Sequence, residues 1–255
     1  MSRLIAYLRY FLYCVNEHSL HAPFVYDFYT KVIRKSKKAS PSQAIEVLRA
    51  SLLNDSTEIE VTDFGAGKNR PPKRIIKKLA RVSSTPFNRS LLLREIIKYT
   101  KAQSIIELGT SLGLNTLYLA SVPGVSVVTF EGSDQIAGYA EKHFRDLSAE
   151  NICVVRGSLQ KTLKDHLGNI PKIDFVYFDA DHRYEPTLEY YTDCLKRSHD
   201  DSVFVFDDIH WSSEMERAWN KIKASPEVTL SIDLYFMGII FFNSSLNKHD
   251  YILSY

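Results

Sequence analysis

Apolar and polar positions follow two patterns along this chain, and the change between them falls near residue 87. From there onward, short apolar runs rich in Val, Ile and Phe alternate with segments whose apolar residues recur at helical spacing. The apolar runs are SIIELG, VSVVTFE, ICVVRG, IDFVYFD and SVFVFDD, and the helical segments are LNTLYLAS, DQIAGYAEKHFRDLS, LQKTLKDHL and EPTLEYYTDCLKR. Near-continuous apolar strands separated by helices predict a parallel sheet that is covered on both faces.

Two further apolar runs, VTLSIDL and FMGIIFF, close the pattern. The chain between them is too short for the crossover that parallel neighbours require. We therefore expect an antiparallel hairpin at the edge of the sheet. The fold class that follows is α/β.

The first 60 residues or so show helical spacing without strands. We expect one helix to about Asn16, a second through PFVYDFYTKVIRK, and a third that opens at Ser40 and Pro41. Proline suits the first helical position, because an N–H there would have no partner within the helix.

The first of these helices has an apolar stripe. It consists of Leu4, Leu8, Phe11, Leu12 and Val15, which recur at helical spacing. We expect the stripe to pack on the protein itself. Arg3 and Arg9 leave a helix that lies on a membrane surface as the alternative.

Residues 62–86 join the two regions and are strongly basic. Lys68, Arg70, Lys73, Arg74, Lys77, Lys78 and Arg81 occur without an acidic residue among them. We expect them to form the solvated face of a helix that follows a loop, and contact with a nucleic acid is the alternative. The predicted division is therefore an N-terminal helical extension with this connector, residues 1–86, and a second domain, residues 87–255.

Composition limits the class of protein. The hydrophobic content of 45% and the charged content of 24% are ordinary for a globular protein, and a net charge of +2 gives no reason to expect a nucleic-acid binder. The three cysteines lie far apart without CxxC spacing, which excludes a zinc ribbon and argues against a disulfide framework. No apolar run reaches the roughly 20 residues needed to span a bilayer. A reducing cytoplasm is the expected location.

The first apolar run ends in a glycine turn. In SIIELGTSLGLNTLYLA, Glu107 closes the strand, and Gly109 and Gly113 flank Thr110 and Ser111 before a helix begins. Glycines let the backbone turn tightly and approach a ligand beside a helix N-terminus. The spacing departs from the GxGxxG fingerprint of dinucleotide-binding proteins.

The second strand ends in an acid. Glu131 comes 24 residues after Glu107. A carboxylate at this place can accept hydrogen bonds from both hydroxyls of a ribose, as in nucleotide-binding α/β folds. The turn and Glu131 together predict a site for a cofactor that contains a ribose.

Two later strands end in carboxylates and a histidine. FVYFDADH contains Asp179 and His182, and FVFDDIH contains Asp207, Asp208 and His210. These side chains should converge, because the carboxyl ends of parallel strands open into one crevice. The three carboxylates are hard oxygen ligands suited to Mg²⁺ or another divalent cation. A histidine with an ordinary pKa near 6.5 can take a proton from a hydroxyl nucleophile, so His182 is the predicted general base and His210 the second candidate.

The motifs IIELGTSLG, VTFEGS, VRGS, FDADHRYE and FVFDDIHW, in this order, resemble those of the class I S-adenosylmethionine-dependent methyltransferases. Within that class they are most similar to the catechol and caffeoyl-CoA O-methyltransferase group and its bacterial relatives. The resemblance covers about residues 87–245. It implies a Rossmann-like, mostly parallel sheet of seven strands with an antiparallel final strand.

The resemblance also implies places for S-adenosylmethionine. The methionine part would face the end of the first strand and the glycine turn, the ribose would face the end of the second strand, and the adenine would lie beyond the third. The residues so assigned to the cofactor are Glu107, Gly109, Thr110, Ser111, Gly113, Glu131, Gly132, Gly157, Ser158 and Asp179.

Two positions depart from the resembling families. Metal-dependent members carry Asp, Asp and Asn around a magnesium ion that binds two substrate hydroxyls, and a lysine that serves as base. Here Asp208 replaces the Asn and His182 replaces the lysine. The first change adds negative charge and leaves the identity of the metal open.

The sequence thus predicts an S-adenosylmethionine-dependent methyltransferase that acts on an oxygen of a small molecule, where oxygen rests on the resemblance alone. A homodimer is compatible with this reading. One alternative is a nucleic-acid-directed methyltransferase or binding protein that uses the basic segment 68–81, although the chain lacks an NPPY-like motif for base methylation. The other is a nicotinamide-dependent oxidoreductase on the same sheet, against which the imperfect glycine pattern and the acidic strand ends argue.

Overall fold

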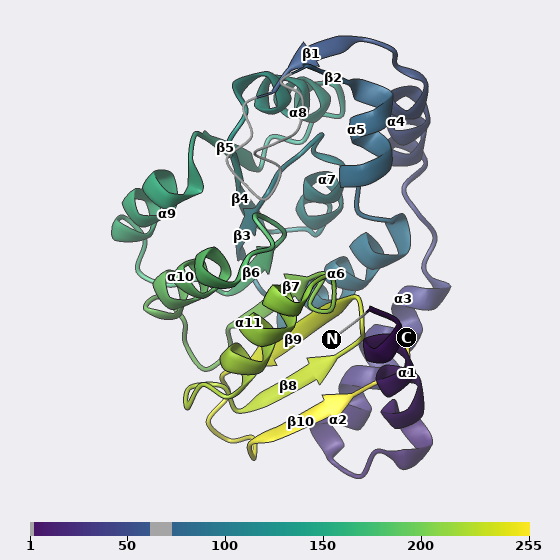
Figure 1. Ribbon diagram of the computed structural model, residues 1–255, viewed down its shortest axis with the longest axis vertical. Coiled ribbons are helices and arrows are strands. Elements are labelled where there is room, and N and C mark those ends of the chain that lie inside the picture. The colour runs from purple at the N-terminus through teal and green to yellow at the C-terminus, as the bar shows by residue number, and fades with distance from the viewer. Residues whose placement is uncertain (1–2, 62–72) are drawn as a thin grey trace.

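An eight-stranded sheet runs through the computed structural model, which describes residues 3–61 and 73–255 (Figure 1). Five parallel strands form its larger part, in the spatial order β7-β6-β3-β4-β5. They are β3 (Ser104–Leu108), β4 (Ser126–Glu131), β5 (Ile152–Arg156), β6 (Phe175–Phe178) and β7 (Val203–Asp207). Each lies within one of the five apolar runs, so the predicted parallel sheet is confirmed.

The other edge of the sheet holds the predicted hairpin and one strand more. β9 (Met237–Phe241) is antiparallel to both β7 and β8 (Leu230–Asp233). Beyond them, β10 (His249–Ile252) pairs in parallel with β8. The predicted number of seven strands is therefore wrong by one. The segment HDYI gave no strand signal because it is not an apolar run, and its first two residues are exposed.

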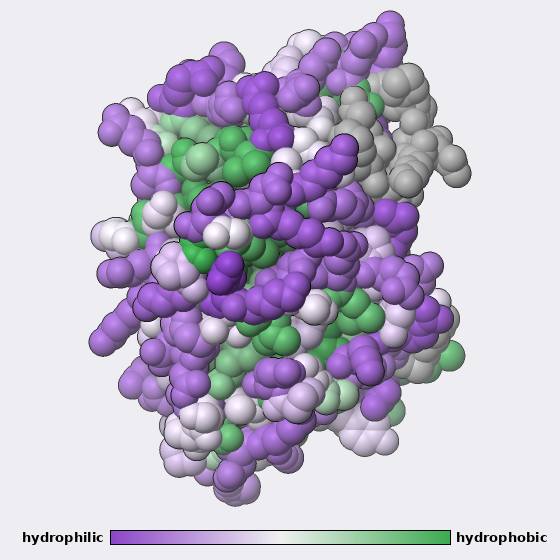
Figure 2. Space-filling view, turned by 90° about the vertical axis from the view of Figure 1, so that its left-hand side faces the viewer, coloured by the Kyte–Doolittle hydropathy of each residue, from purple (hydrophilic) through white to green (hydrophobic). Residues whose placement is uncertain are grey.

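Helices cover both faces of the sheet. They are α6 (Phe87–Thr100), α7 (Leu114–Ala120), α8 (Asp134–Asp146), α9 (Leu159–Gly168), α10 (Tyr184–Leu195) and α11 (Ser213–Lys223). Ile105 packs in one core with Ile96 of α6, whereas its neighbour Ile106 packs in the other with Leu163 of α9 and Trp219 of α11, as the alternation of a strand requires. The side of the molecule that carries α9 and α10 is largely hydrophilic, with apolar side chains in separate patches (Figure 2).

The second predicted helix consists of three consecutive helical segments that pack together on the sheet. It runs from α2 (Pro23–Phe28) through a π-helical turn (Tyr29–Ile33) to α3 (Arg34–Lys38). Its buried side chains share a core with those of α6 and of the strands; they are Val25, Phe28, Tyr29, Val32 and Ile33. This helix is therefore part of the cover of the sheet.

The third predicted helix, α4 (Gln43–Asn54), begins later than expected. Ser42, and not Ser40, is the residue before its first turn. The backbone N–H of Ser42 donates to the hydroxyl of Tyr118 in α7 at 3.3 Å. This tertiary contact lies at the start of the helix, and local sequence signals did not contain it.

The first helix, α1 (Arg3–Tyr13), turns its apolar stripe outward. Ala6 is the buried residue of α1, whereas Leu4 and Leu12 are 67% and 73% exposed. The hydroxyl of Tyr10 donates to the backbone carbonyl of Leu253 at 2.9 Å. The expectation that the stripe packs on the protein is therefore wrong for Leu4, Leu8, Phe11 and Leu12, whereas Val15, beyond the end of α1, is partly buried against the core. Within α1 the narrower face with Ala6 and Tyr10 makes the contact. Among the described residues, no helix is long and apolar enough to cross a membrane.

The basic connector is folded where the structure describes it. β2 (Lys73–Ile75) pairs with β1 (Glu58–Glu60), and α5 (Ile76–Ser83) follows directly. Ile76, Leu79 and Ala80 of α5 are buried, in a core shared with α4, α7 and α8, while Lys78 and Arg81 are exposed. α5 is the expected helix with one solvated face, whereas Lys73 and Arg74 lie in β2 and not in that helix. Lys68 and Arg70 lie outside the described residues, and the division at residue 86 stays a prediction.

Candidate active site

The carboxyl ends of β3, β4, β6 and β7 meet at one edge of the sheet. β6 lies between β3 and β7, and β4 lies beside β3. The backbone N–H of Asp179, the residue after β6, donates to the carbonyl of Leu108 at the end of β3 at 2.9 Å. Asp207 ends β7. The strand order therefore brings the glycine turn and the two acidic strand ends together, as the sequence predicted.

The glycine turn needs its glycines. Gly109 has φ of +107°, and a Cβ there would lie 2.4 Å from the backbone oxygen of Asp179. Gly113 has φ of +80°, and its Cβ would lie 2.5 Å from the ring of Phe144 in α8. L side chains rarely adopt such φ values. The turn is thus held close to both β6 and α8, and α7 starts immediately after it.

Glu107 is buried beneath this turn. Its carboxylate accepts hydrogen bonds from Asn115 at 2.8 Å, from Thr129 at 2.6 Å and from Thr116. Burial raises the pKa of Glu107 to about 7, although these donors oppose the rise. Glu107 therefore joins β3 to α7 and β4, and its predicted contact with a cofactor stays a prediction.

Glu131 lies at the end of β4, half-buried, with its carboxylate beside the turn. One oxygen accepts from the backbone N–H of Ser111 at 2.9 Å, and the other from that of Ser133 at 3.0 Å. The backbone carbonyl of Glu131 accepts from Gly157 at 2.9 Å, so Gly157 and Ser158, which precedes α9, lie next to the end of β4. These two backbone donors hold the carboxylate in place beside the glycine turn.

The other residues of the turn differ in what they can present to a ligand. The hydroxyl of Thr110 is buried against that of Thr129 at 2.6 Å. Ser111 is partly exposed, has φ of +49°, and its hydroxyl lies 2.7 Å from that of Ser83. Gly132 is partly exposed and directly follows Glu131. Thr110 can therefore offer a ligand its backbone only.

A short segment covers the glycine turn from the side of α5. Ser83, Ser84 and Thr85 line a small cavity together with the turn and Asp179, and its volume is about 10 Å³. That is roughly the space of a single water molecule. A ligand larger than water can occupy this cavity only if its lining moves.

An acidic cluster adjoins the turn at the ends of β6 and β7. Nε2 of His182 lies 3.4 Å from Oδ1 of Asp179. The guanidinium of Arg89, from α6, lies 3.8 Å from Oδ1 of Asp207 and 3.8 Å from Oδ1 of Asp208. His182 and Asp208 both have positive φ, at +47° and +52°. Backbone of this kind is costly for residues other than glycine and is typical of functional sites.

The charges of this cluster determine its protonation. Burial alone would lower the pKa of His182, but its hydrogen bond to Asp179 and the charges of Asp208 and Asp207 raise it to about 9. Burial first, and then the charges of Asp179 and Asp208, raise the pKa of Asp207 well above its usual range. The raised pKa favours the protonated form of His182, and its role as general base stays a prediction.

The predicted metal site does not fit this arrangement. Residues 3–61 and 73–255 contain no group of three or more His, Cys, Asp or Glu side chains placed to hold a metal ion. Asp179, Asp207 and Asp208 lie in the same cluster, but Asp179 faces His182, and the guanidinium of Arg89 stands within 4 Å of the other two.

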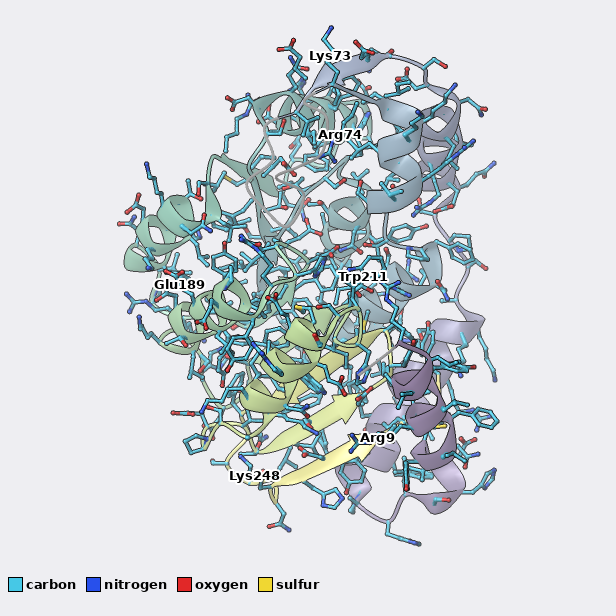
Figure 3. The ribbon with its side chains drawn as sticks, in the orientation of Figure 1. Arg9, Lys73, Arg74, Glu189, Trp211 and Lys248 are labelled. Carbon is cyan, nitrogen blue, oxygen red and sulfur yellow. The ribbon has the colours of Figure 1, made fainter. Side chains whose placement is uncertain are left out.

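His210, the second predicted base, faces a different element. Its Nε2 lies 2.9 Å from Oδ2 of Asp233 at the end of β8, and its ring stacks on Tyr235 with centroids 5.6 Å apart. Next to it, Trp211 lies near the N-terminal end of α1 (Figure 3), where Arg3 packs 3.3 Å from the centre of its ring. His210 therefore belongs to the contact between β7, the hairpin and α1.

Two features of the site had no clear sequence signal. The segment Ser83–Thr85 comes from the end of α5 and the residues after it, which the sequence presented as the end of a connector, and Arg89 comes from the first turn of α6. Pro86 before an apolar, helix-forming run, FNRSLLLREIIKYT, was the available sign of a helix there. Nothing local showed that this helix would begin over the crevice.

Comparisons with known proteins agree with this geometry. Residues 106–209 match the family model of a methyltransferase domain. No curated protein matches the chain. Among solved structures, similar folds include the O-methyltransferase from Bacillus cereus in complex with S-adenosylhomocysteine, at 19% identity, coverage of 82% of this chain and 96% of that one, and a TM-score of 0.60.

Two further solved structures show the same likeness. The S-adenosylhomocysteine-bound methyltransferase PaMTH1 from Podospora anserina has 15% identity and a TM-score of 0.60, and covers 88% of this chain and 99% of its own. The O-methyltransferase TomG from Streptomyces achromogenes, in complex with S-adenosylmethionine, has 17% identity and a TM-score of 0.59, and covers 84% and 96%. At these identities the likeness establishes the fold.

Proposed function

Because the chain carries a methyltransferase domain on this fold, we propose that it transfers the methyl group of S-adenosylmethionine to an oxygen of a small molecule. One observation carries the proposal. The glycine turn of β3 and the acid of β4 stand side by side, with Ser111 donating its N–H to Glu131 at 2.9 Å. Beside them lie Asp179 and the acidic cluster, whose carboxylates can take up a proton. The structural neighbours named above, crystallised with this cofactor or its product, support the choice of cofactor.

The cofactor would lie across the ends of β3, β4 and β5. Glu131 would accept hydrogen bonds from the ribose hydroxyls. The backbone of Gly109–Gly113 would face the methionine part, and Gly157 and Ser158 the adenine. Glu107 would act from below, by holding α7 and β4 in register with the turn through its three hydrogen bonds.

The chemistry needs alignment and one proton acceptor. An acceptor hydroxyl gives up its proton, its oxygen forms a bond to the methyl carbon, and the carbon–sulfur bond breaks with its electron pair passing to the sulfonium sulfur. Alignment of the oxygen with the methyl group supplies much of the rate. The proton would pass to the carboxylate pair Asp207–Asp208, whose affinity for protons is raised by burial and by neighbouring carboxylates.

Calorimetric titration of S-adenosylmethionine into the protein tests the proposal. We expect micromolar binding that Glu131→Ala weakens by at least tenfold, about 1.4 kcal/mol. Glu141→Ala is a matched control, because Glu141 pairs with Arg156 on the surface of α8. If the cofactor does not bind, the proposal fails, and nicotinamide cofactors and RNA become the next ligands to titrate.

A further inference from the structure

We propose that Arg89 is the resident cation of the acidic crevice and binds the acceptor oxygen, in the place where a divalent metal was predicted. The inference rests on the proposed methyl transfer for the identity of the acceptor. It makes the enzyme independent of divalent metals. Its acceptor would be a small molecule with an acidic hydroxyl, which reacts as an oxyanion.

The position of Arg89 is fixed by its surroundings. It lies in the first turn of α6, just after the segment that covers the glycine turn. Its guanidinium packs 4.6 Å from the centre of the Phe236 ring, between β8 and β9. The Phe236 ring on one side and two carboxylates on the other hold the guanidinium of Arg89 in this position.

The charges of the crevice favour this cation over a metal. Asp207 and Asp208 each have an oxygen 3.8 Å from the guanidinium of Arg89, whose positive charge offsets part of their negative charge. Asp179 already faces His182. A divalent ion held by Asp207 and Asp208 would have to displace a guanidinium that stands 3.8 Å from both, against the repulsion between like charges.

The guanidinium of Arg89 also has N–H groups that can donate hydrogen bonds to a ligand. Both carboxylates lie beyond hydrogen-bond distance, and one oxygen of Asp207 has no hydrogen-bond partner among the described residues. A planar guanidinium with several N–H groups suits an oxyanion, which can accept two of them. An acceptor oxygen between Arg89 and Asp207–Asp208 would therefore lose its proton to the carboxylates and keep its negative charge beside Arg89. Attack on the methyl carbon then releases the neutral thioether.

A metal-binding measurement tests the inference without any assay of activity. Mn²⁺ is titrated into wild type, Arg89→Ala and Arg94→Ala, and the free ion is followed by its paramagnetic resonance signal. Arg94 is the control, because it lies on the same helix but pairs with Glu95. We expect wild type and Arg94→Ala to leave Mn²⁺ free, and Arg89→Ala to bind about one ion. Binding by the wild type, or none by a folded Arg89→Ala, overturns the inference.

Kinetics then test the contact with the acceptor. A chelator such as EDTA should leave wild-type turnover unchanged. Arg89→Lys, which keeps the charge but not the fork of donors, and Arg89→Ala should raise KM for the acceptor by at least tenfold, with the affinity for S-adenosylmethionine unchanged. If the cofactor binds and EDTA abolishes turnover, the inference fails while the proposed function stands. If the cofactor does not bind, the proposed function itself has failed.

Discussion

Glu107 lies beneath the glycine turn, fully buried, with Asn115, Thr116 and Thr129 as its hydrogen-bond donors. Burial penalises the charged form more than the three donors favour it, so the pKa rises from 4.5 to about 7. A carboxylate with this pKa binds a proton more readily in the folded than in the unfolded chain. Its contribution to stability is full below about pH 4.5 and is lost as the pH rises through 7.

We expect Glu107→Gln to remove this pH dependence. In the wild type the contribution of Glu107 falls by about 3 kcal/mol between pH 4.5 and 7. The neutral amide cannot titrate, so the free energy of unfolding of the variant should change less over this range. Urea unfolding at a series of pH values measures the difference. Glu150→Gln, at an exposed position, should keep the wild-type slope, and an equal slope in Glu107→Gln would contradict the assignment.

His182 is charged when protonated, whereas Glu107 is neutral when protonated. Both residues nevertheless contribute less stability as the pH rises, because both pKa values are raised. The charged form of His182 is favoured by Asp179, Asp208 and Asp207, which raise the pKa from 6.5 to about 9 despite burial. The stability that it contributes is therefore full below about pH 6.5 and is lost as the pH rises through 9. The two windows meet near neutrality, which allows them to be measured separately.

Proton NMR of the imidazole tests this assignment directly. The signal assigned to His182, through its loss in His182→Gln, should titrate with a midpoint near 9 rather than the ordinary 6.5. Asp179→Asn should move that midpoint down, because the hydrogen bond and charge of Asp179 are the largest of the effects that raise it. A midpoint at or below 6.5 in the wild type would favour His182 as the general base.

At the scale of elements, strand ends were predictable and their covering segments were not. Apolar runs and their terminal acids predicted the strands and the meeting of Gly109, Glu131, Asp179 and Asp207, because the topology of a parallel sheet fixes which ends are neighbours. β10 was missed because its sequence is polar. α4 begins at Gln43, after Ser42, which contacts Tyr118, and not after Ser40. The placement of Arg89 and the charge on His182 depend on side chains from several elements, and no local pattern contains that information.

The segment Ser83–Thr85 gives a prediction at this scale. The hydrogen bond between the hydroxyls of Ser83 and Ser111 favours the conformation in which the cavity at the glycine turn measures about 10 Å³. A cofactor that needs the segment displaced must break this bond, whose net worth is about 1 kcal/mol. Ser83→Ala should therefore bind S-adenosylmethionine up to about fivefold more tightly, as the closed conformation loses stability. Calorimetry would measure this, with Ser51→Ala on the exposed side of α4 as control; weaker binding would indicate that Ser83 contacts the cofactor instead.

At the scale of the molecule, the N-terminal helices differ in how far they belong to the fold. Val25, Phe28, Val32 and Ile33 are fully buried, in a core with the strands of the sheet. By contrast α1 buries Ala6 and leaves its apolar stripe exposed. The predicted division at residue 86 therefore separates segments that share a core, while α1 contacts the rest through a narrow face.

These contacts predict how truncated chains behave. Loss of the four buried side chains removes about 2 kcal/mol each, or about 8 kcal/mol in total, which is comparable to the whole stability of a typical domain. Residues 87–255 alone should therefore fail to unfold cooperatively, whereas residues 14–255, which lack only α1 and the two residues before it, should keep a single transition. Thermal unfolding followed by circular dichroism at two wavelengths distinguishes the two. A cooperative transition of 87–255 would instead make that segment an independent domain, as the sequence first suggested, and would limit the N-terminal helices to covering it.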